Sequence, residues 1–277
     1  MTAPTYTPDD SPRLHVTEAG TPGAPTLLLL HAVATSGWMW ERQAELLSDF
    51  HLLIPDLPGH GASNTVPWRS LDETVKLLAE LVARKAEGPV YVVGLSLGAY
   101  VGLRLTEHFP ERVDRAVLSG VNVLPFPNAR VMGLMGYMML PFLKTDAFLK
   151  ANARGLRIPE VHYAGYRRSA KAMSRWAYLS IGRELMRFGL PAEVDRITCP
   201  TLVIAGEREQ ALIRESVPRL TAVLPDAQGY VVPGLGHGWS GEAPELFAQT
   251  VRAWVTEQPL PKELVGLEDA EVAVATP

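Results

Sequence analysis

The chain has 277 residues, of which 26 are Lys or Arg and 30 are Asp or Glu, so its formal net charge is −4. With 47% hydrophobic and 20% charged residues, it has the composition of a soluble globular protein, which argues against a disordered, fibrous or membrane-embedded chain. A pI near 6.0 argues against a nucleic-acid-binding domain. The single cysteine, Cys199, excludes an internal disulfide and a cysteine-based zinc site.

Neither secretion nor membrane insertion is indicated by any segment. Residues 1–14 contain prolines and aspartates and lack the apolar stretch of a signal peptide. The longest nearly apolar run, residues 131–143, is about half the length that spans a bilayer and is interrupted by two glycines. We therefore expect a cytoplasmic protein with no stably inserted membrane segment.

Along the chain, short runs of leucine and β-branched residues alternate with longer amphipathic segments. The expected strands are residues 14–18, 26–31, 51–55, 90–95, 115–118, 201–205 and 229–232. The expected helices are residues 38–48, 71–85, 97–108, 212–224 and 244–257. This alternation predicts the α/β class, with a mostly parallel central sheet flanked by helices.

The alternation is interrupted once, between residues 122 and 190. No strand is evident there, and basic, methionine and aromatic residues recur at helical spacing, which predicts an inserted helical lid above the strand ends. The insertion contains 11 basic and three acidic residues, a net charge of +8, which leaves −12 for the remainder. We expect residues 1–121 and 191–257 to form the core and residues 258–277 to be a loosely ordered tail.

The strongest motif is Gly94-Leu95-Ser96-Leu97-Gly98, a G-x-S-x-G sequence between an apolar strand and a helix. This context is typical of a nucleophile elbow, in which a serine occupies a sharp and strained turn. Cβ atoms two residues before and after Ser96 would collide, which explains both glycines. The turn directs the Ser96 hydroxyl above the N-terminus of the helix, where a developing oxyanion is stabilised. We expect Ser96 to be a nucleophile.

An activated serine needs a base, and the chain offers seven histidines. His237 follows the last expected strand, is flanked by glycines and precedes the final helix, so we expect it to be the base. His31 and His60 lie in loops, and we interpret them as residues that fix those loops. The remaining histidines lie beside strand or helix surfaces and are interpreted as solvated: His15, His51, His108 and His162.

A carboxylate that orients the base is expected after the strand at residues 201–205, where Glu207 and Glu209 follow Gly206. Side-chain direction alternates along a strand but not through the loop beyond it. Spacing alone therefore does not distinguish Glu207 from Glu209, and both could instead be surface charges.

Five segments occur together and in a fixed order: LHAV at residues 30–33, DLPGHGAS at 56–63, GLSLG at 94–98, PTLVIAGE at 200–207 and GLGH at 234–237. With these segments the chain resembles the α/β-hydrolase superfamily, in its branch of single-domain serine hydrolases with a helical lid. The resemblance covers nearly the whole chain. The joint match is highly specific, because the order of serine, acid and histidine is also that of the family.

The resemblance implies a catalytic triad of Ser96, His237 and Glu209, since the acid of this family lies three residues after Gly206. The acid position usually holds Asp, and the extra methylene of Glu209 requires a shifted loop.

Two backbone N–H groups, those of Val33 and Leu97, are implied by the resemblance as the oxyanion hole. At the residue before Val33 the family usually has glycine, whereas this chain has Ala32. A Cβ at Ala32 restricts the backbone, so the oxyanion loop is expected to be narrower.

The implied reaction is hydrolysis of carboxylic esters of small to medium acyl groups through an acyl-enzyme on Ser96, with no metal and no cofactor. The same motifs are compatible with a lactonase, a thioesterase, a C–C hydrolase, a hydroxynitrile lyase or a slow-turnover ligand receptor. The expected partner is a small-molecule ester, without nucleic acid, and the oligomeric state stays open.

Candidate substrate-binding residues lie in and around the insertion. Met135, Met138 and Met139 are expected to form an adaptable wall for an acyl chain, or else to pack the lid against the core. Trp239, two residues after His237, is expected at the pocket mouth, or else in the packing of the core, and Trp38 is a further candidate. The basic insertion favours an anionic or carrier-protein-bound ester, or else forms a solvated face that pairs with the acidic core.

Overall fold

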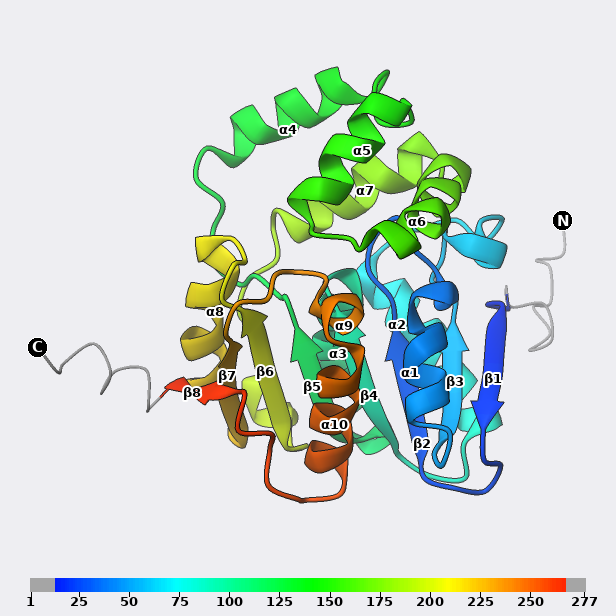
Figure 1. Ribbon diagram of the computed structural model, residues 1–277, viewed down its shortest axis with the longest axis vertical. Coiled ribbons are helices and arrows are strands. Elements are labelled where there is room, and N and C mark those ends of the chain that lie inside the picture. Colours follow the sequence, from blue (N-terminus) through cyan, green and yellow to red (C-terminus); the bar gives the residue numbers. More distant parts are fainter. Residues whose placement is uncertain (1–12, 268–277) are drawn as a thin grey trace, which may run out of the picture.

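The computed structural model describes residues 13–267, and an eight-stranded sheet forms the centre of this part of the chain (Figure 1). The strands lie in the spatial order β1-β3-β2-β4-β5-β6-β7-β8. Their bounds are β1 (Val16–Gly20), β2 (Thr26–Leu30), β3 (His51–Pro55), β4 (Val90–Leu95), β5 (Val113–Ser119), β6 (Thr201–Gly206), β7 (Ala227–Val232) and β8 (Val265–Gly266). Strands β2 to β7 pair in parallel, and only the edge strands β1 and β8 are antiparallel to their neighbours. The predicted α/β fold with a mostly parallel sheet is confirmed.

Strand β2 shows why the middle of the sheet forms from these residues. It contains four consecutive leucines at residues 27–30, each at most 1% exposed. Because side chains alternate along a strand, Leu28 and Leu30 pack on one face of the sheet while Leu27 and Leu29 pack on the other. An apolar run without polar interruptions is what a parallel strand covered on both faces requires. Each fully buried leucine contributes about 1.5–3 kcal/mol.

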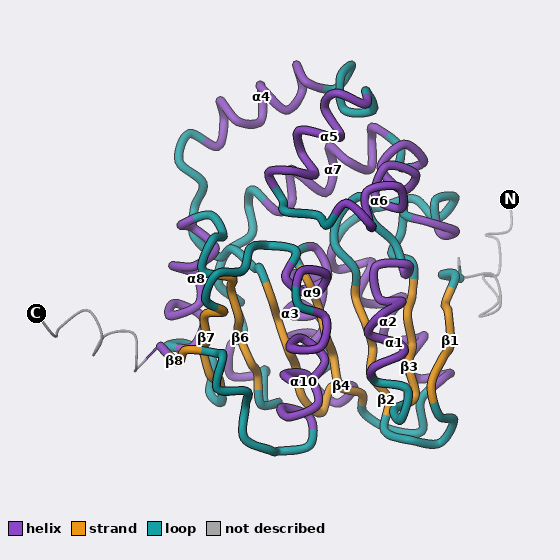
Figure 2. Tube along the Cα trace, in the orientation of Figure 1, coloured by secondary structure: helices purple, strands orange, loops and turns teal. Residues whose placement is uncertain are grey.

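Helices cover both faces of the sheet (Figures 1 and 2). One face carries α2 (Leu71–Lys85), α3 (Leu97–His108) and α8 (Ala211–Thr221). The other carries α1 (Glu41–Leu46), α9 (Trp239–Glu242) and α10 (Pro244–Val255). Helix α2 begins where the Ser70 hydroxyl accepts a hydrogen bond from the Glu73 N–H at 3.1 Å, a cap that fixes its first turn. The expected helix at residues 38–48 is divided into a 3₁₀ turn, Gly37–Trp40, followed by α1.

Four further helices separate β5 from β6 in the sequence. They are α4 (Ala129–Met139), α5 (Asp146–Gly155), α6 (Glu160–Ala172) and α7 (Arg175–Leu185). Figure 1 shows them grouped above the carboxyl ends of the parallel strands, the edge at which parallel α/β sheets form their sites. We call residues 122–190 the helical insertion.

Expectations for the two ends of the chain need correction. Strand β1 begins at Val16, two residues later than expected. Residues 1–12, most of the N-terminal segment without a signal-peptide pattern, lie outside the described residues. Part of the expected loose tail is held against the core, because Leu264 is buried and Val265 pairs with Val231 of β7. A two-residue strand recruited by a sheet edge leaves no local pattern in the sequence. The rest of that tail, residues 268–277, also lies outside the described part.

Candidate active site

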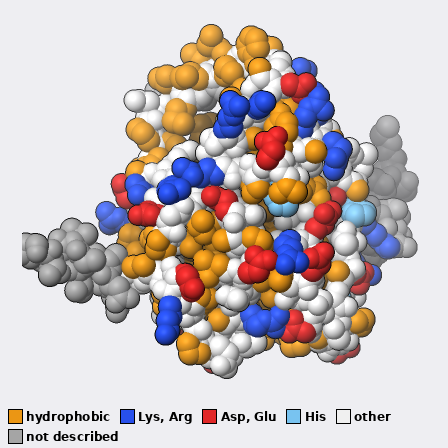
Figure 3. Space-filling model, viewed as in Figure 1, with side chains coloured by type: hydrophobic (Ala, Val, Ile, Leu, Met, Phe, Trp, Pro, Cys, Tyr) orange, Lys and Arg blue, Asp and Glu red, His pale blue; other side chains and the backbone are white. Residues whose placement is uncertain are grey.

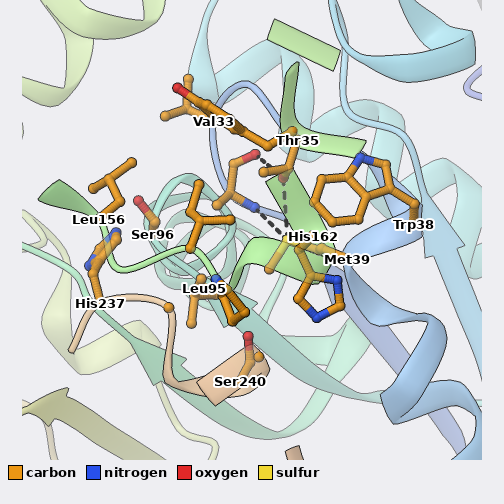
Figure 4. Close-up of a pocket in the computed structure, with 16 residues that line it drawn as sticks. Val33, Thr35, Trp38, Met39, Leu95, Ser96, Leu156, His162, His237 and Ser240 are labelled. Atoms are coloured by element: carbon orange, nitrogen blue, oxygen red, sulfur yellow. Dashed lines mark hydrogen bonds between the residues drawn. The ribbon is translucent and has the colours of Figure 1, made fainter. Parts of the chain in front are cut away.

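Ser96 occupies the turn between β4 and α3 with φ 54° and ψ −121°, a conformation that residues with a side chain rarely adopt. Both neighbouring glycines are required by contacts of the turn. A Cβ at Gly98 would overlap the carbonyl oxygen of Leu30, and one at Gly94 would overlap the carbonyl oxygen of Gly98. The turn is closed by the Ser96 N–H, which donates to the Ser119 carbonyl at 2.8 Å. The expected strained elbow is therefore present, and Figure 4 shows the Ser96 hydroxyl at the cavity.

His237 lies in the loop after β7, and its Nδ1 is 2.7 Å from Oε2 of Glu209. The second carboxylate oxygen of Glu209 accepts the Gly206 N–H at 3.1 Å, and the Glu209 side chain has no exposed surface. A carboxylate accepts from Nδ1, so this contact places the imidazole proton on Nδ1 and leaves Nε2 as an acceptor. Gly120, with φ 74°, lies so close to the ring that a Cβ there would be 2.8 Å from Cε1 of His237.

Glu207 lies apart from His237. Its Oε2 accepts the N–H of Gly234 at 2.6 Å, and the side chain is exposed. The structure thus brings Glu209, and not Glu207, to the imidazole. The loop 206–209 accommodates the longer side chain of a glutamate, since the Glu209 N–H also donates back to the Gly206 carbonyl at 3.1 Å.

Ser96 and His237 line the same cavity (Figure 4). Within the described residues, their side chains form no hydrogen bond with each other. Hydrogen bonds between nucleophile and base are often long in unliganded enzymes and shorten when substrate binds.

Val33 and Leu97, the expected oxyanion-hole residues, are both near the serine, Leu97 as the next residue of the chain and Val33 in the lining of the same cavity. Leu97 is the first residue of α3. The left-handed residue of the Val33 loop is Ala34, with φ 59°, so the Cβ of Ala32 meets no backbone strain. The Ala32 carbonyl accepts the Thr35 hydroxyl at 2.6 Å, which braces the loop.

Asp56 connects this loop to the next one, a role that the sequence motif did not reveal. Its two carboxylate oxygens accept the N–H groups of Gly37 at 2.7 Å and of Ala62 at 2.8 Å. At Gly61 a Cβ would overlap this carboxylate, which explains the glycine. The 56–63 motif is therefore part of the support for the cavity.

His31 and His60 lie beneath the same loops, as expected, and are both buried. Nε2 of His31 accepts the Leu57 N–H at 2.9 Å, so its Nδ1 donates to the Ala32 carbonyl at 2.8 Å. Nδ1 of His60 lies 2.9 Å from the carbonyl of Pro58. Burial lowers the pKa of His31 to about 4 and, together with the nearby His31, the pKa of His60 to about 3.

These two pKa values predict that the protein loses stability in mild acid. An unfolded histidine has a pKa of about 6.5. The unfolded chain therefore binds more protons below that pH, and stability is lost as the pH falls from there toward the folded values. We expect a loss on the order of 2 kcal/mol per histidine at about pH 5. Urea unfolding at neutral pH and at about pH 5 measures this difference in the free energy of unfolding.

The variant His60→Asn, which keeps an N–H donor for Pro58, isolates one of the two contributions. Its free energy of unfolding should be lower at neutral pH but should change less with pH than that of the wild type. Equal pH dependence in the two proteins would contradict the assignment.

A cavity of about 660 Å³, including its open mouth, extends from Ser96 between the core and the helical insertion. Trp38 lines it, as expected, and its Nε1 donates to Ser169 of α6 at 2.8 Å. His162, interpreted from sequence as solvated, also lines the cavity, with its ring 5.9 Å from that of Trp38. The insertion residues that line the cavity were not identified from sequence: Leu156, Ile158, Pro159, His162 and Tyr166.

The other candidates do not line the cavity, and for Trp239 the alternative of core packing is what the structure shows. Trp239 is fully buried on the opposite side of the His237 loop, where it packs on Phe247 and its Nε1 donates to Ser119 at 2.8 Å. The sequence does not indicate whether a large apolar side chain next to the His237 loop packs toward the cavity or toward the core. The methionines of α4 do not line the cavity: Met135, Met138 and Met139 are 59%, 66% and 38% exposed.

Among the described residues, no cluster of three or more His, Cys, Asp or Glu side chains is arranged to hold a metal ion. In the same part of the chain, no helix combines the length and apolarity needed to cross a bilayer.

Known proteins resemble this chain in sequence and in fold. An AB hydrolase superfamily protein of Gibberella zeae is 29% identical over 87% of this chain and 83% of its own. A pimeloyl-[acyl-carrier protein] methyl ester esterase of Nitrosomonas europaea is 28% identical over 84% of this chain and 96% of its own. The crystal structure of an enol-lactonase from Burkholderia xenovorans LB400 shares the fold, with a TM-score of 0.76, 21% identity and coverage of 88% of this chain and 96% of its own.

A sequence profile described as the alpha/beta hydrolase family matches residues 27–250, which include the Ser96 turn, both glutamates and His237. This match spans most of the chain and agrees with the sheet order and the Ser96 turn. The protein belongs to the alpha/beta hydrolase family.

Proposed function

We propose that the protein is a serine hydrolase that cleaves carboxylic esters of small to medium acyl groups through an acyl-enzyme. The observation that carries this proposal is the buried Glu209 carboxylate 2.7 Å from Nδ1 of His237, in a site where the strained Ser96 lines the same cavity. A carboxylate, an imidazole and a serine in this relation are the parts of a nucleophilic acyl-transfer site.

In the proposed mechanism, Nε2 of His237 takes the proton of Ser96 while Oγ attacks the ester carbonyl. Glu209 stabilises the imidazolium and keeps its Nδ1 protonated. The backbone N–H groups of Val33 and Leu97 hold the oxyanion of the tetrahedral intermediate. His237 then returns the proton to the departing alcohol, which leaves the acyl group on Ser96. Water activated by His237 attacks this acyl-enzyme and releases the acid.

The cavity lining favours an uncharged acyl group. No Lys, Arg, Asp or Glu side chain is among the residues that line the cavity, and its polar groups are few. Placing a charged acyl group there would cost desolvation without a partner. The basic residues of the helical insertion therefore act outside the cavity, where they attract an anionic leaving group or a carrier protein only at long range.

The chain-length preference of ester hydrolysis tests this proposal. In a series of p-nitrophenyl esters from acetate to palmitate, we expect sustained turnover with an optimum at short to medium chains. Longer chains outgrow the space between Ser96 and the helical insertion. Ile158→Trp, which fills part of the cavity, should move the optimum to shorter chains.

Val161→Trp is the matched control, because Val161 lies on the same insertion, is 81% exposed and does not line the cavity. Its chain-length profile should equal that of the wild type. Release of a single stoichiometric burst of product, or the same profile for Ile158→Trp and wild type, would contradict the proposal.

A further inference from the structure

Helix α4 presents apolar side chains that nothing in the described part of the chain covers. Apart from Arg130 at its start, this helix and the turn after it contain no charged residue through residue 143. Figure 3 shows hydrophobic side chains gathered at the top of the molecule, where Figure 1 places α4. The large side chains that are more than half exposed are Val131, Leu134, Met135, Tyr137, Met138 and Phe142. We call these six residues the α4 surface.

The α4 surface faces away from the rest of the molecule. At 100° per residue, the five of its members that belong to the helix span an arc of about 160°. On the other side of the helix, Met132 and Met139 are less exposed, at 41% and 38%, and a Cβ at Gly133 would lie 3.9 Å from Met186. The outward side chains thus neither fill the core nor line the catalytic cavity. Soluble proteins rarely expose a contiguous apolar surface of this kind unless it binds something.

Helix α7, which contacts α4, and the residues just after it carry basic and aromatic side chains that we call the border of the α4 surface. Nε of Arg175 donates to the Leu140 carbonyl at 3.1 Å, which holds this guanidinium at the end of α4. The next residue, Trp176, is 66% exposed. Arg183 and Arg187 are exposed and lie before and after Met186 in the sequence, and Met186 is the residue nearest to Gly133 of α4.

The positive charge of this border is not neutralised locally. Within the described residues, neither Arg183 nor Arg187 forms an ion pair. Glu184, the one acidic residue of α7, faces inward, where its two carboxylate oxygens accept the indole N–H of Trp68 at 2.8 Å and the N–H of Leu71 at 2.9 Å.

We propose that the α4 surface docks onto an anionic lipid surface. Leucine and methionine side chains bordered by Trp, Tyr and Arg are the combination that binds at the boundary between headgroups and acyl chains. The helical insertion carries a net charge of +8 and the remainder of the chain −12. An anionic surface therefore attracts the insertion, repels the core and turns α4 toward the lipid. A second copy would instead bring two arginine borders against each other, which like-charge repulsion disfavours.

Co-sedimentation with vesicles tests the docking. The full chain should bind vesicles of phosphatidylcholine mixed with phosphatidylglycerol more tightly than vesicles of phosphatidylcholine alone, and added salt should weaken the binding. Leu134→Ser combined with Met138→Ser should reduce the partition coefficient by about tenfold or more, because two apolar side chains leave the interface. Arg183→Glu combined with Arg187→Glu should reduce it by at least about tenfold on anionic vesicles.

Matched controls show whether the loss of vesicle binding is specific to the α4 surface or follows from any change of an exposed apolar or charged residue. Val161→Ser changes an exposed apolar side chain of the same insertion outside the α4 surface, and Arg219→Glu reverses an exposed charge on α8. Both controls should bind vesicles like the wild type. Equal binding by all variants, or no preference for anionic vesicles, would overturn the proposal. The proposal would also be overturned if the wild type failed to bind vesicles and formed a dimer, and if Leu134→Ser combined with Met138→Ser converted that dimer to a monomer.

Discussion

Replacing Ser96 by alanine is expected to lower ester turnover by about 10⁴-fold or more. Alanine keeps the Cβ and therefore the turn, whose φ of 54° is set by Gly94, Gly98 and the bond to the Ser119 carbonyl. Only the hydroxyl is lost, and with it the acyl-enzyme. The measurement is kcat/KM for the best p-nitrophenyl ester, accompanied by thermal unfolding to show that the fold is retained.

A fluorophosphonate, which labels activated serines covalently, supplies an independent readout. The wild type should gain the mass of one phosphonyl group on Ser96, and Ser96→Ala should gain none. Ser180→Ala, in α7 of the helical insertion and outside the cavity, serves as the matched control and should be labelled and active like the wild type. If Ser96→Ala kept more than about a tenth of the activity, the serine mechanism would be rejected.

Glu209→Gln is expected to lower kcat/KM by roughly 10²- to 10⁴-fold with little change in overall fold. The amide is of similar size, but it is neutral, so it no longer stabilises the imidazolium. Its N–H₂ group can also donate to Nδ1, which selects the tautomer with the proton on Nε2. In that tautomer His237 cannot accept the proton of Ser96.

Glu207→Gln is the control that the chain itself offers, two residues away. It retains an oxygen for the Gly234 N–H and removes the same charge from the same loop, so activity should stay within about threefold of wild type. The activity of Glu209→Asp should lie between those of Glu207→Gln and Glu209→Gln, because the shorter carboxylate reaches Nδ1 of His237 only if the 206–209 loop shifts. Equal losses for Glu207→Gln and Glu209→Gln would show that loop charge, and not the contact with His237, determines activity.

Local signals in the sequence were sufficient for several elements. The bounds of β3, β4, α2 and α3 agree with those expected, because each combines an apolar pattern with a clear terminator. Helix α2 has its Ser70 cap, and α3 follows the glycine-flanked turn of Ser96. A strained turn between two glycines can be inferred from sequence, since the reason for the glycines is steric and lies within a few residues.

The residues that line the cavity could not be predicted from the sequence in the same way. Large apolar side chains suit a substrate pocket, which is why the sequence indicates Trp239 and the methionines of α4, yet Trp239 is buried in the core and those methionines are exposed. His162 was interpreted as solvated and lines the cavity. Apolar and imidazole side chains fit a core, a cavity or a surface equally well. Which of these environments each side chain occupies depends on how the helices of the insertion pack over the sheet.

By itself the sequence determined the α/β class, the strained position of Ser96, the place of His237 after the last parallel strand and the division into a negatively charged core and a positively charged insertion. These follow from periodicity and short-range sterics, which depend on residues close together in the chain, and from composition, which does not depend on the folded geometry. The tertiary structure alone decided that Glu209 rather than Glu207 reaches the imidazole, that Asp56 connects two loops under the cavity, and that α6 and the turn before it line the cavity. Each of these depends on segments that are far apart along the chain, and the folded sheet and the packing of the helical insertion bring them together.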